Sequence, residues 1–360
     1  ERGFQQGQAV FLGGMSNHLE VPARELDASG RLGEPQITGT FSSQLFADAA
    51  ADFLTAQSPE EPFYCYVSFT APHDPRMPPA EVLANYDPDD LPLPKNFLPQ
   101  HPFHNGWMTG RDEVLAPWPR TPEIIRQQLA EYYGMITHMD GQIGRILDAL
   151  ETAGHSKNTI IVFTSDHGLA LGSHGLLGKQ NLYDHSMRAP LIFSGPGIPR
   201  EASSEALVYL FDILPTLCHL TGLDVPSGVE GRDLTPILSG SSGAVRDSVF
   251  TIYEDVQRAV RDERWKLIVY PQINRRQLFD LANDPHELHD LSAESQYDGH
   301  VARLTERMLR WQAVVGDEQP LTVTDPESDV LDLSGRARTP DRHQPAEIVE
   351  KYFGAVQSSE

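Results

Sequence analysis

Residues 159–199, TIIVFTSDHGLALGSHGLLGKQNLYDHSMRAPLIFSGPGIP, decide the fold of this chain. The stretch begins and ends with two apolar, β-branched runs, at 159–164 and 189–193, which predict two buried strands of a parallel sheet. The segment between them is polar and rich in glycine, as expected of a loop at one edge of a sheet. We therefore predict an α/β fold with a parallel sheet.

The polar segment concentrates side chains that suit a metal and anion site. Asp166 and His167 directly follow the first run, and ligands of open α/β sheets bind at the carboxyl ends of the strands. Together, a hard anionic ligand, imidazoles and cations on one loop indicate a metal ion beside an anionic group. A solvated polar loop is the alternative, and the density of such side chains disfavours it. The candidate residues are Asp166, His167, His174, Lys179, His185 and Arg188.

A further candidate follows the apolar run at 63–69, which predicts another strand. The run ends at Ala-Pro-His-Asp-Pro, where two prolines fix the loop that carries His73. A histidine beside prolines is more often structural than catalytic, but the position of His73 at a strand's carboxyl end favours a functional role. An Asx-turn explains Asp74 equally well.

Charge and composition exclude some classes of function. The net charge of −23 over 360 residues argues against nucleic acid as a partner, because phosphate backbones need a basic surface. Any anionic substrate must therefore be attracted by local cations. No apolar run reaches the length of a membrane span. Cys65 and Cys218 cannot form a disulfide framework and are predicted to be buried thiols.

The remaining pattern predicts a large domain at 1–243, a smaller one at 244–316 and a polar arm at 317–360. A glycine- and serine-rich stretch at 239–243 is the predicted linker. The loop at 76–120 is rich in proline and aromatic residues and is predicted to be a wall of the substrate site or plain surface packing. Helices are predicted at 41–57, from Thr121 to Gly154, at 210–220 and at 297–315, and short antiparallel strands at 248–253, 258–261, 265–270 and 277–281.

These motifs, in this order, resemble the sulfatase family of the alkaline phosphatase superfamily. The resemblance rests on Ser-Asp-His-Gly, Gly-x-His-Gly, Gly-Lys and Tyr-Asp-x-x-x-Arg-x-Pro-Leu-Ile in the central stretch. Pro-His-Asp-Pro at 72–75, Met-Asp-Gly-Gln-Ile-Gly at 139–144, Leu-Phe-Asp-Leu at 278–281 and Asp-Pro at 284–285 agree with it. It extends from residue 1 to about residue 311. It implies an alkaline-phosphatase-like α/β fold, with a mixed, mostly parallel sheet flanked by helices and a smaller C-terminal α+β subdomain.

The resemblance also implies roles for the candidate residues. Asp166 and His167 match ligands of a divalent metal. Softness alone would favour zinc or manganese at His167, whereas the family favours Ca²⁺. Lys179 and His73 match residues that bind the sulfate and stabilise the departing oxygen. His174, His185 and Arg188 remain open between substrate contacts and structural roles, and for Arg188 the structural alternative is an ion pair with Asp184.

The resemblance implies an enzyme whose nucleophile is not among the residues of this chain. Its nucleophile is a formylglycine made from Cys or Ser in a Cys/Ser-x-Pro-x-Arg motif, which neither Cys65 nor Cys218 matches. We therefore expect the nucleophile in a missing N-terminal segment and expect the chain alone to be inactive. The expected activity is release of sulfate from a sulfated carbohydrate or similar ester by a bacterial, periplasmic or secreted enzyme. The alternatives are a phosphodiesterase or phosphonate monoester hydrolase and a non-catalytic binding protein with this fold. The oligomeric state is left open.

Overall fold

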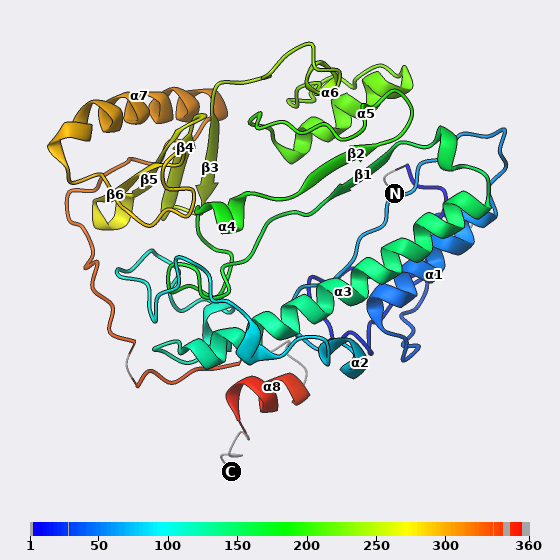
Figure 1. Cartoon of the computed structure of the whole chain (residues 1–360), viewed down its shortest axis with the longest axis horizontal. Coiled ribbons are helices and arrows are strands. Elements are labelled where there is room, and N and C mark those ends of the chain that lie inside the picture. Colours follow the sequence, from blue (N-terminus) through cyan, green and yellow to red (C-terminus); the bar gives the residue numbers. More distant parts are fainter. Residues whose placement is uncertain (1–2, 28, 334, 341–345, 355–360) are drawn as a thin grey trace. The chain divides into compact units, whose positions relative to one another are not determined.

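The computed structural model describes residues 3–27, 29–333, 335–340 and 346–354. The chain forms two compact units (Figure 1). Unit 1 comprises Glu1–Leu93, Val114–Thr159 and Gly335–Glu360, and unit 2 comprises Pro94–Glu113 and Ile160–Ser334. The domain boundaries drawn at residues 243 and 316 from the sequence stay predictions.

Unit 1 is built around two long helices, α1 (Ser42–Thr55) and α3 (Pro122–Thr152), which pack side by side (Figure 1). Both confirm helices predicted from apolar periodicity. The Thr121 hydroxyl accepts a hydrogen bond from the Ile124 amide at 3.3 Å, so the N-cap expected from the Thr-Pro pair is present. Unit 1 also contains α2 (Ala80–Leu83), α8 (Ala346–Phe353) and the 3₁₀ helices η1 (Pro88–Asp90) and η3 (Ser156–Asn158). Helix α8 lies in the segment predicted as an arm, and its Tyr352 side chain is buried.

Residues 63–70 of unit 1 are extended but form no strand, which corrects the strand predicted there. Their burial alternates with a period of two: Val67 and Phe69 pack against a core that includes Phe46, whereas Tyr64 and Tyr66 are exposed. The side-chain pattern of a strand is therefore present. Within the described residues this segment has no neighbouring strand to complete a ladder of hydrogen bonds.

In unit 2, strands β1 (Ile161–Thr164) and β2 (Leu191–Ser194) confirm the two strands expected around the central loop, but their pairing is antiparallel. The predicted parallel arrangement is therefore wrong for this pair. Two parallel neighbours require a crossover that carries the chain back to the end of the sheet where the first strand began. Residues 165–190 instead leave β1 and enter β2 at the same end of the sheet. The prediction of burial is also wrong, because Phe163 and Ile192 are exposed. Within the described chain, β1 and β2 form a two-stranded sheet of their own.

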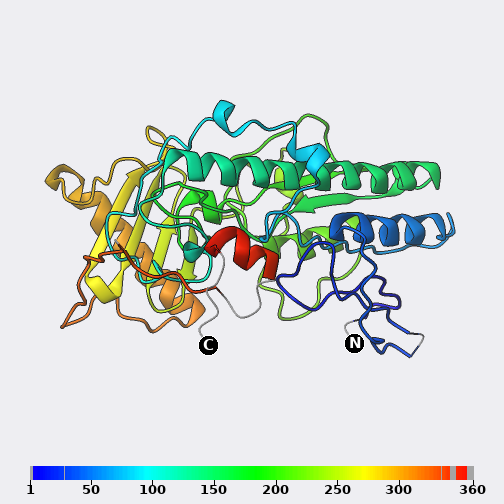
Figure 2. The same cartoon turned by 90° about the horizontal axis from the view of Figure 1, so that it is seen from below.

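The second sheet of unit 2 confirms the antiparallel strands predicted near the C-terminus. It contains β3 (Val249–Tyr253), β4 (Gln257–Arg261), β5 (Trp265–Tyr270) and β6 (Arg275–Asp280), in that order. Helix α7 (Asp298–Val315) lies across one face of the sheet (Figures 1 and 2). Val301, Leu304 and Met308 of α7 pack with Val260 and Leu267 of the sheet in one core.

Shorter helices complete unit 2. They are α4 (Asp184–Met187), α5 (Ile213–Thr221), α6 (Thr235–Leu238) and the 3₁₀ helices η4 (Leu210–Asp212), η5 (Pro271–Ile273) and η6 (Ser295–Tyr297). A further 3₁₀ helix, η2, spans Glu113–Leu115. Together η4 and α5 confirm the helix predicted at 210–220. Among the helices of the described residues, none combines the length and the apolar character needed to cross a membrane.

Candidate active site

Asp166 and His167 stand at the carboxyl end of β1 and face one another. The His167 amide donates to Asp166 Oδ1 at 2.9 Å, and His167 Nε2 lies 3.5 Å from Asp166 Oδ2. On the other side of the ring, Nδ1 lies 2.9 Å from the carbonyl oxygen of Gly168. Because a carbonyl only accepts, Nδ1 carries a proton, and Nε2 is the ring nitrogen that faces the carboxylate. Histidines that ligate metals are oriented in this way.

Gly168 ties the start of this loop to its end. Its amide donates to the Ser186 carbonyl at 2.8 Å. A Cβ atom at position 168 would lie 2.0 Å from the His185 carbonyl oxygen, so the close approach of the two backbones requires glycine. The strand end that carries Asp166 and His167 is thereby held against α4.

Lys179 is fixed by an ion pair that the sequence did not reveal. Its Nζ lies 3.0 Å from Asp112 Oδ2, and the Asp112 side chain is only 4% exposed, against 21% for Lys179. Burial alone would raise the pKa of Asp112, but the charges of Lys179 and Arg111 lower that pKa to about 2. Asp112 is therefore ionised at neutral pH and holds the ammonium at a defined place.

The backbone beside Lys179 is held by the neighbouring carboxylate, Glu113. The amides of Leu177 and Gly178 both donate to Glu113, at 3.0 and 2.8 Å. Sequence reasoning missed Asp112 and Glu113, because they lie in a loop without periodicity. Two consecutive carboxylates among prolines and aromatic residues were the only local signal.

His174 is packed inside the loop, with a positive φ of 53°. Its Nε2 donates to the Glu287 carbonyl at 2.9 Å, and Nδ1 lies 3.3 Å from the Asn96 amide nitrogen, which can donate to it. The ring stacks on Tyr183 with centroids 3.9 Å apart. Burial lowers the pKa of His174 to about 4, so the ring is neutral at pH 7. These contacts support the structural role left open for His174, and a contact with substrate stays a prediction.

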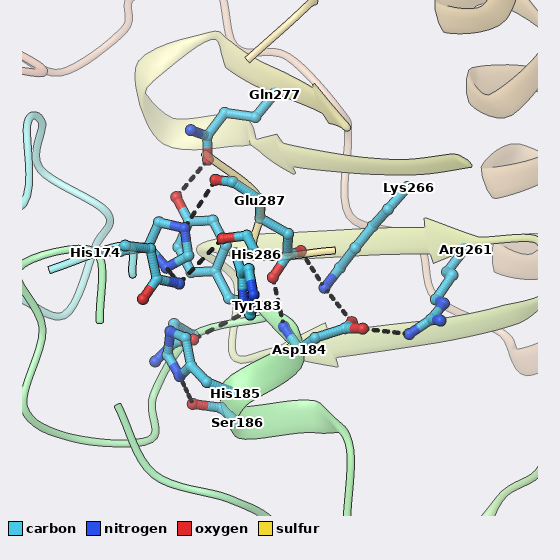
Figure 3. A network of polar contacts seen from close by, with 12 residues as sticks. His174, Tyr183, Asp184, His185, Ser186, Arg261, Lys266, Gln277, His286 and Glu287 are labelled. Atoms are coloured by element: carbon cyan, nitrogen blue, oxygen red, sulfur yellow. Dashed lines mark hydrogen bonds and ion pairs between the residues drawn. The ribbon is translucent and has the colours of Figure 1, made fainter. Parts of the chain in front are cut away.

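His185 lies in the same stack of rings, next to a buried network of charges (Figure 3). Its Nδ1 contacts the Ser186 hydroxyl at 3.0 Å, and its buried Nε2 has no hydrogen-bond partner among the described residues. Burial lowers the pKa of His185 well below its ordinary value. A role of His185 in substrate binding stays a prediction.

The network of charges beside these rings joins α4 to the second sheet. Lys266 of β5 contacts Asp184 Oδ1 at 2.9 Å and Glu287 Oε1 at 2.7 Å, and Arg261 of β4 also binds Asp184 (Figure 3). The ion pair of Arg188 with Asp184 that the sequence left open is therefore wrong, because two other cations occupy this carboxylate. Arg188 is 67% exposed, with its guanidinium 3.8 Å from Glu205.

His73 belongs to unit 1, and the other six candidates belong to unit 2. Nδ1 of His73 donates to the Asp74 carbonyl at 2.8 Å and lies 3.2 Å from the Asp74 carboxylate. The His73 side chain is 26% exposed, whereas Asp74 is nearly buried at 5%. Asp74 thus orients the imidazole, a more specific role than the Asx-turn left open.

A metal ion would find two donors in this loop, the Asp166 carboxylate and His167 Nε2. The described residues contain no group of three or more histidine, cysteine or carboxylate side chains that could enclose an ion. The carboxylate suits calcium, and the imidazole suits zinc or manganese. The pair fits a partial metal site, and the choice of Ca²⁺ stays a prediction.

A carboxylate–imidazole pair and an ammonium held by an ion pair lie on one loop, and these side chains could hold an anionic group beside a metal ion. The Sulfatase family model matches residues 7–223, and the model of the C-terminal part of N-sulphoglucosamine sulphohydrolase matches residues 172–314. The chain belongs to the sulfatase family, and its fold is the alkaline-phosphatase-like fold found in solved sulfatase structures.

Individual proteins similar to this chain include sulfatases and a related hydrolase. An arylsulfatase of Clostridium perfringens is 30% identical over 273 residues, which cover 72% of this chain and 55% of the relative. A solved 2-O GAG sulfatase is 25% identical with a TM-score of 0.65, covering 81% of this chain and 67% of its own. A phosphonate monoester hydrolase of Silicibacter pomeroyi is also 25% identical, with a TM-score of 0.65 over 84% of this chain and 66% of its own. The chain thus spans about half the length of the arylsulfatase.

Proposed function

We propose that this chain supplies part of the active site of a sulfuric ester hydrolase that releases sulfate from a sulfated carbohydrate or similar ester. The observation that carries the proposal is the orientation of His167, whose Nδ1–H is bound to Gly168 so that Nε2 faces Asp166. The likeness to an arylsulfatase and to a 2-O GAG sulfatase supports the sulfate ester as substrate. The nucleophile in this proposal is a formylglycine contributed from outside this chain, and the chain alone is inactive.

Each candidate residue has a role in this reaction. Asp166 and His167 hold the divalent ion, Ca²⁺ in this proposal, which supplies Lewis acidity toward the sulfate oxygens. The Lys179 ammonium, positioned by Asp112, stabilises negative charge on the sulfate and the departing oxygen. His73, with Nδ1 held by Asp74, donates a proton from Nε2 to the departing alcohol when the ring is protonated.

Replacement of the lysine tests the proposal. In the natural full-length protein, Lys179→Ala should lower kcat for 4-nitrophenyl sulfate by ~10²-fold or more, as expected for loss of a charge contact in the transition state. Lys157→Ala, at an exposed lysine in η3, is the matched control and should leave the rate unchanged. Near-normal turnover in Lys179→Ala would refute the role of Lys179.

A second candidate function is hydrolysis of phosphonate monoesters or phosphodiesters, which the likeness to the Silicibacter pomeroyi enzyme favours. The comparison of kcat/KM for 4-nitrophenyl sulfate and for a 4-nitrophenyl phosphonate monoester distinguishes the two. A clear preference for the phosphonate would move the assignment to the second candidate.

The isolated chain provides a test of the third alternative, a non-catalytic binding protein. With two protein donors, Asp166 and His167, we expect weak binding of Ca²⁺ and a small thermal shift at millimolar calcium. A large shift at micromolar calcium would contradict this expectation and favour a chain that binds metal without the rest of an active site. Asp166→Asn is the control, and it should abolish whatever shift the wild-type chain shows.

A further inference from the structure

A buried histidine of unit 1, His18, lies directly behind the loop that carries His73. Its ring is 1% exposed and stacks on Phe41, with centroids 5.2 Å apart and planes within 7°. Nε2 of His18 lies 3.2 Å from the carbonyl oxygen of His73. Since a carbonyl only accepts, His18 donates this hydrogen bond.

The other side of His18 is attached to the first residue of α1. Nδ1 lies 2.6 Å from the Ser42 hydroxyl, and the Ser42 amide donates to the His18 carbonyl at 2.7 Å. With the proton of the neutral ring on Nε2, Nδ1 accepts from the hydroxyl. Ser42 is fully buried. His18 therefore connects a fixed point on a long helix to the main chain of His73.

The main chain of His73 is held on both sides. Its amide donates to the Thr70 carbonyl at 3.0 Å, and its carbonyl accepts from His18. Its side chain is held at Nδ1 by Asp74. A shift of the His73 carbonyl would therefore turn the whole residue, including the imidazole.

We propose that His18 is a positioning residue for His73, fixing the backbone of the His73 loop against α1 and so setting the direction of the His73 imidazole. The inference rests on the proposed function of His73. His18 itself stays neutral: burial lowers its pKa to about 4, although the bond to the His73 carbonyl opposes the shift. The ionisable groups that face His18 are His73 and Asp74 from the loop and His138 from α3.

Two variants of His18 separate its two hydrogen bonds. In His18→Gln, the amide nitrogen can replace Nε2 and donate to the His73 carbonyl. In His18→Asn, the shorter amide can reach Ser42 but not His73. Both variants lose the stacking on Phe41, so the difference between them reports which of the two hydrogen bonds is kept, the one to His73 in Gln or the one to Ser42 in Asn.

The readouts are the imidazole ¹⁵N and ¹³C resonances of His73 in the histidine-labelled chain, and kinetics in the natural full-length protein. We expect His18→Asn to move the His73 resonances and to lower kcat by about tenfold, since a small misplacement of a catalytic group is costly. The alkaline limb of the pH–rate profile, which reports the group that must be protonated, should shift while KM stays nearly constant. His18→Gln should restore the resonances and most of kcat.

The positioning role would be overturned by a folded His18→Asn protein with wild-type His73 resonances, kcat and pH profile. Equal effects of Asn and Gln would also overturn it, because the loss would then come from packing. Wild-type turnover of His73→Ala would instead remove the catalytic role of His73, whatever His18 does. The two failures are thus distinguishable.

Discussion

Replacement of Lys266 by methionine should be among the most destabilising single changes in unit 2. Its side chain is 3% exposed, and its ammonium is shared by Asp184 and Glu287, which is 2% exposed (Figure 3). Burial and the neighbouring Asp184 charge raise the pKa of Glu287, while Lys266 opposes them. Methionine fills a similar volume without the charge, so the effect is electrostatic.

The size of the effect follows from what the variant leaves behind. Asp184 keeps Arg261, but the Glu287 carboxylate keeps only the hydrogen bond from the Asp184 amide at 2.8 Å among its contacts within the described residues. Removing one partner of a buried ion pair costs about 3–5 kcal/mol, because the other charge stays buried. We expect a loss of this size in the free energy of unfolding of Lys266→Met.

Urea unfolding followed by circular dichroism and tryptophan fluorescence measures the loss. The double variant Lys266→Met with Glu287→Gln removes the Glu287 charge that the single variant leaves without its cation. The glutamine oxygen still accepts from the Asp184 amide. The double variant should therefore be more stable than the single variant by about 1–3 kcal/mol. Lys157→Met, at an exposed lysine, is the control and should change stability by less than about 0.5 kcal/mol.

Two outcomes would refute this reasoning. A single variant within about 1 kcal/mol of the wild type would mean that the ammonium does not compensate the buried carboxylates. A double variant less stable than Lys266→Met would mean that the unpaired Glu287 charge is not the source of the lost unfolding free energy. Hydrogen exchange at the His174 ring measures the effect locally, because Nε2–H of this ring donates to the Glu287 carbonyl.

Two further predictions concern the loop and the response to acid. Gly168→Ala should lower the melting temperature and weaken metal binding, because the new Cβ would lie 2.0 Å from the His185 carbonyl; a thermal scan with and without calcium that matches wild type would contradict this. Acid should destabilise the fold in two steps. The folded pKa of about 4 for His18 and for His174 lies below the ordinary 6.5, so their contribution is complete above pH 6.5 and is lost as pH falls toward 4. Asp112, with a folded pKa of about 2 against 3.8, contributes above pH 4 and loses this as pH falls toward 2; unfolding midpoints constant from pH 7 to 3 would refute both.

Helices were predictable because their signals are local. Thr121 and Pro122 mark the start of α3, and an apolar residue recurs every three or four positions along its length. The meander β3–β6 was predictable for a similar reason, since neighbouring strands are joined by short turns.

Strand pairing was not predictable from the same kind of signal. The runs at 159–164 and 189–193 identify strands but do not say which edges meet, and we predicted the wrong direction. The run at 63–69 has the side-chain alternation of a strand without a partner in the described chain. Pairing depends on backbone hydrogen bonds to distant residues, which leave no mark in the local sequence.

In the candidate site, too, local features could be predicted from the sequence, whereas contacts between distant residues could not. The sequence by itself determined the sulfatase-like motifs and the residue types, with Asp166, His167 and Lys179 on one loop after a strand. Only the tertiary structure decided that His167 presents Nε2 to Asp166 and that Asp112 holds Lys179. The reason is physical: the protonated nitrogen of a ring and the charge of a buried carboxylate depend on neighbours brought together by folding.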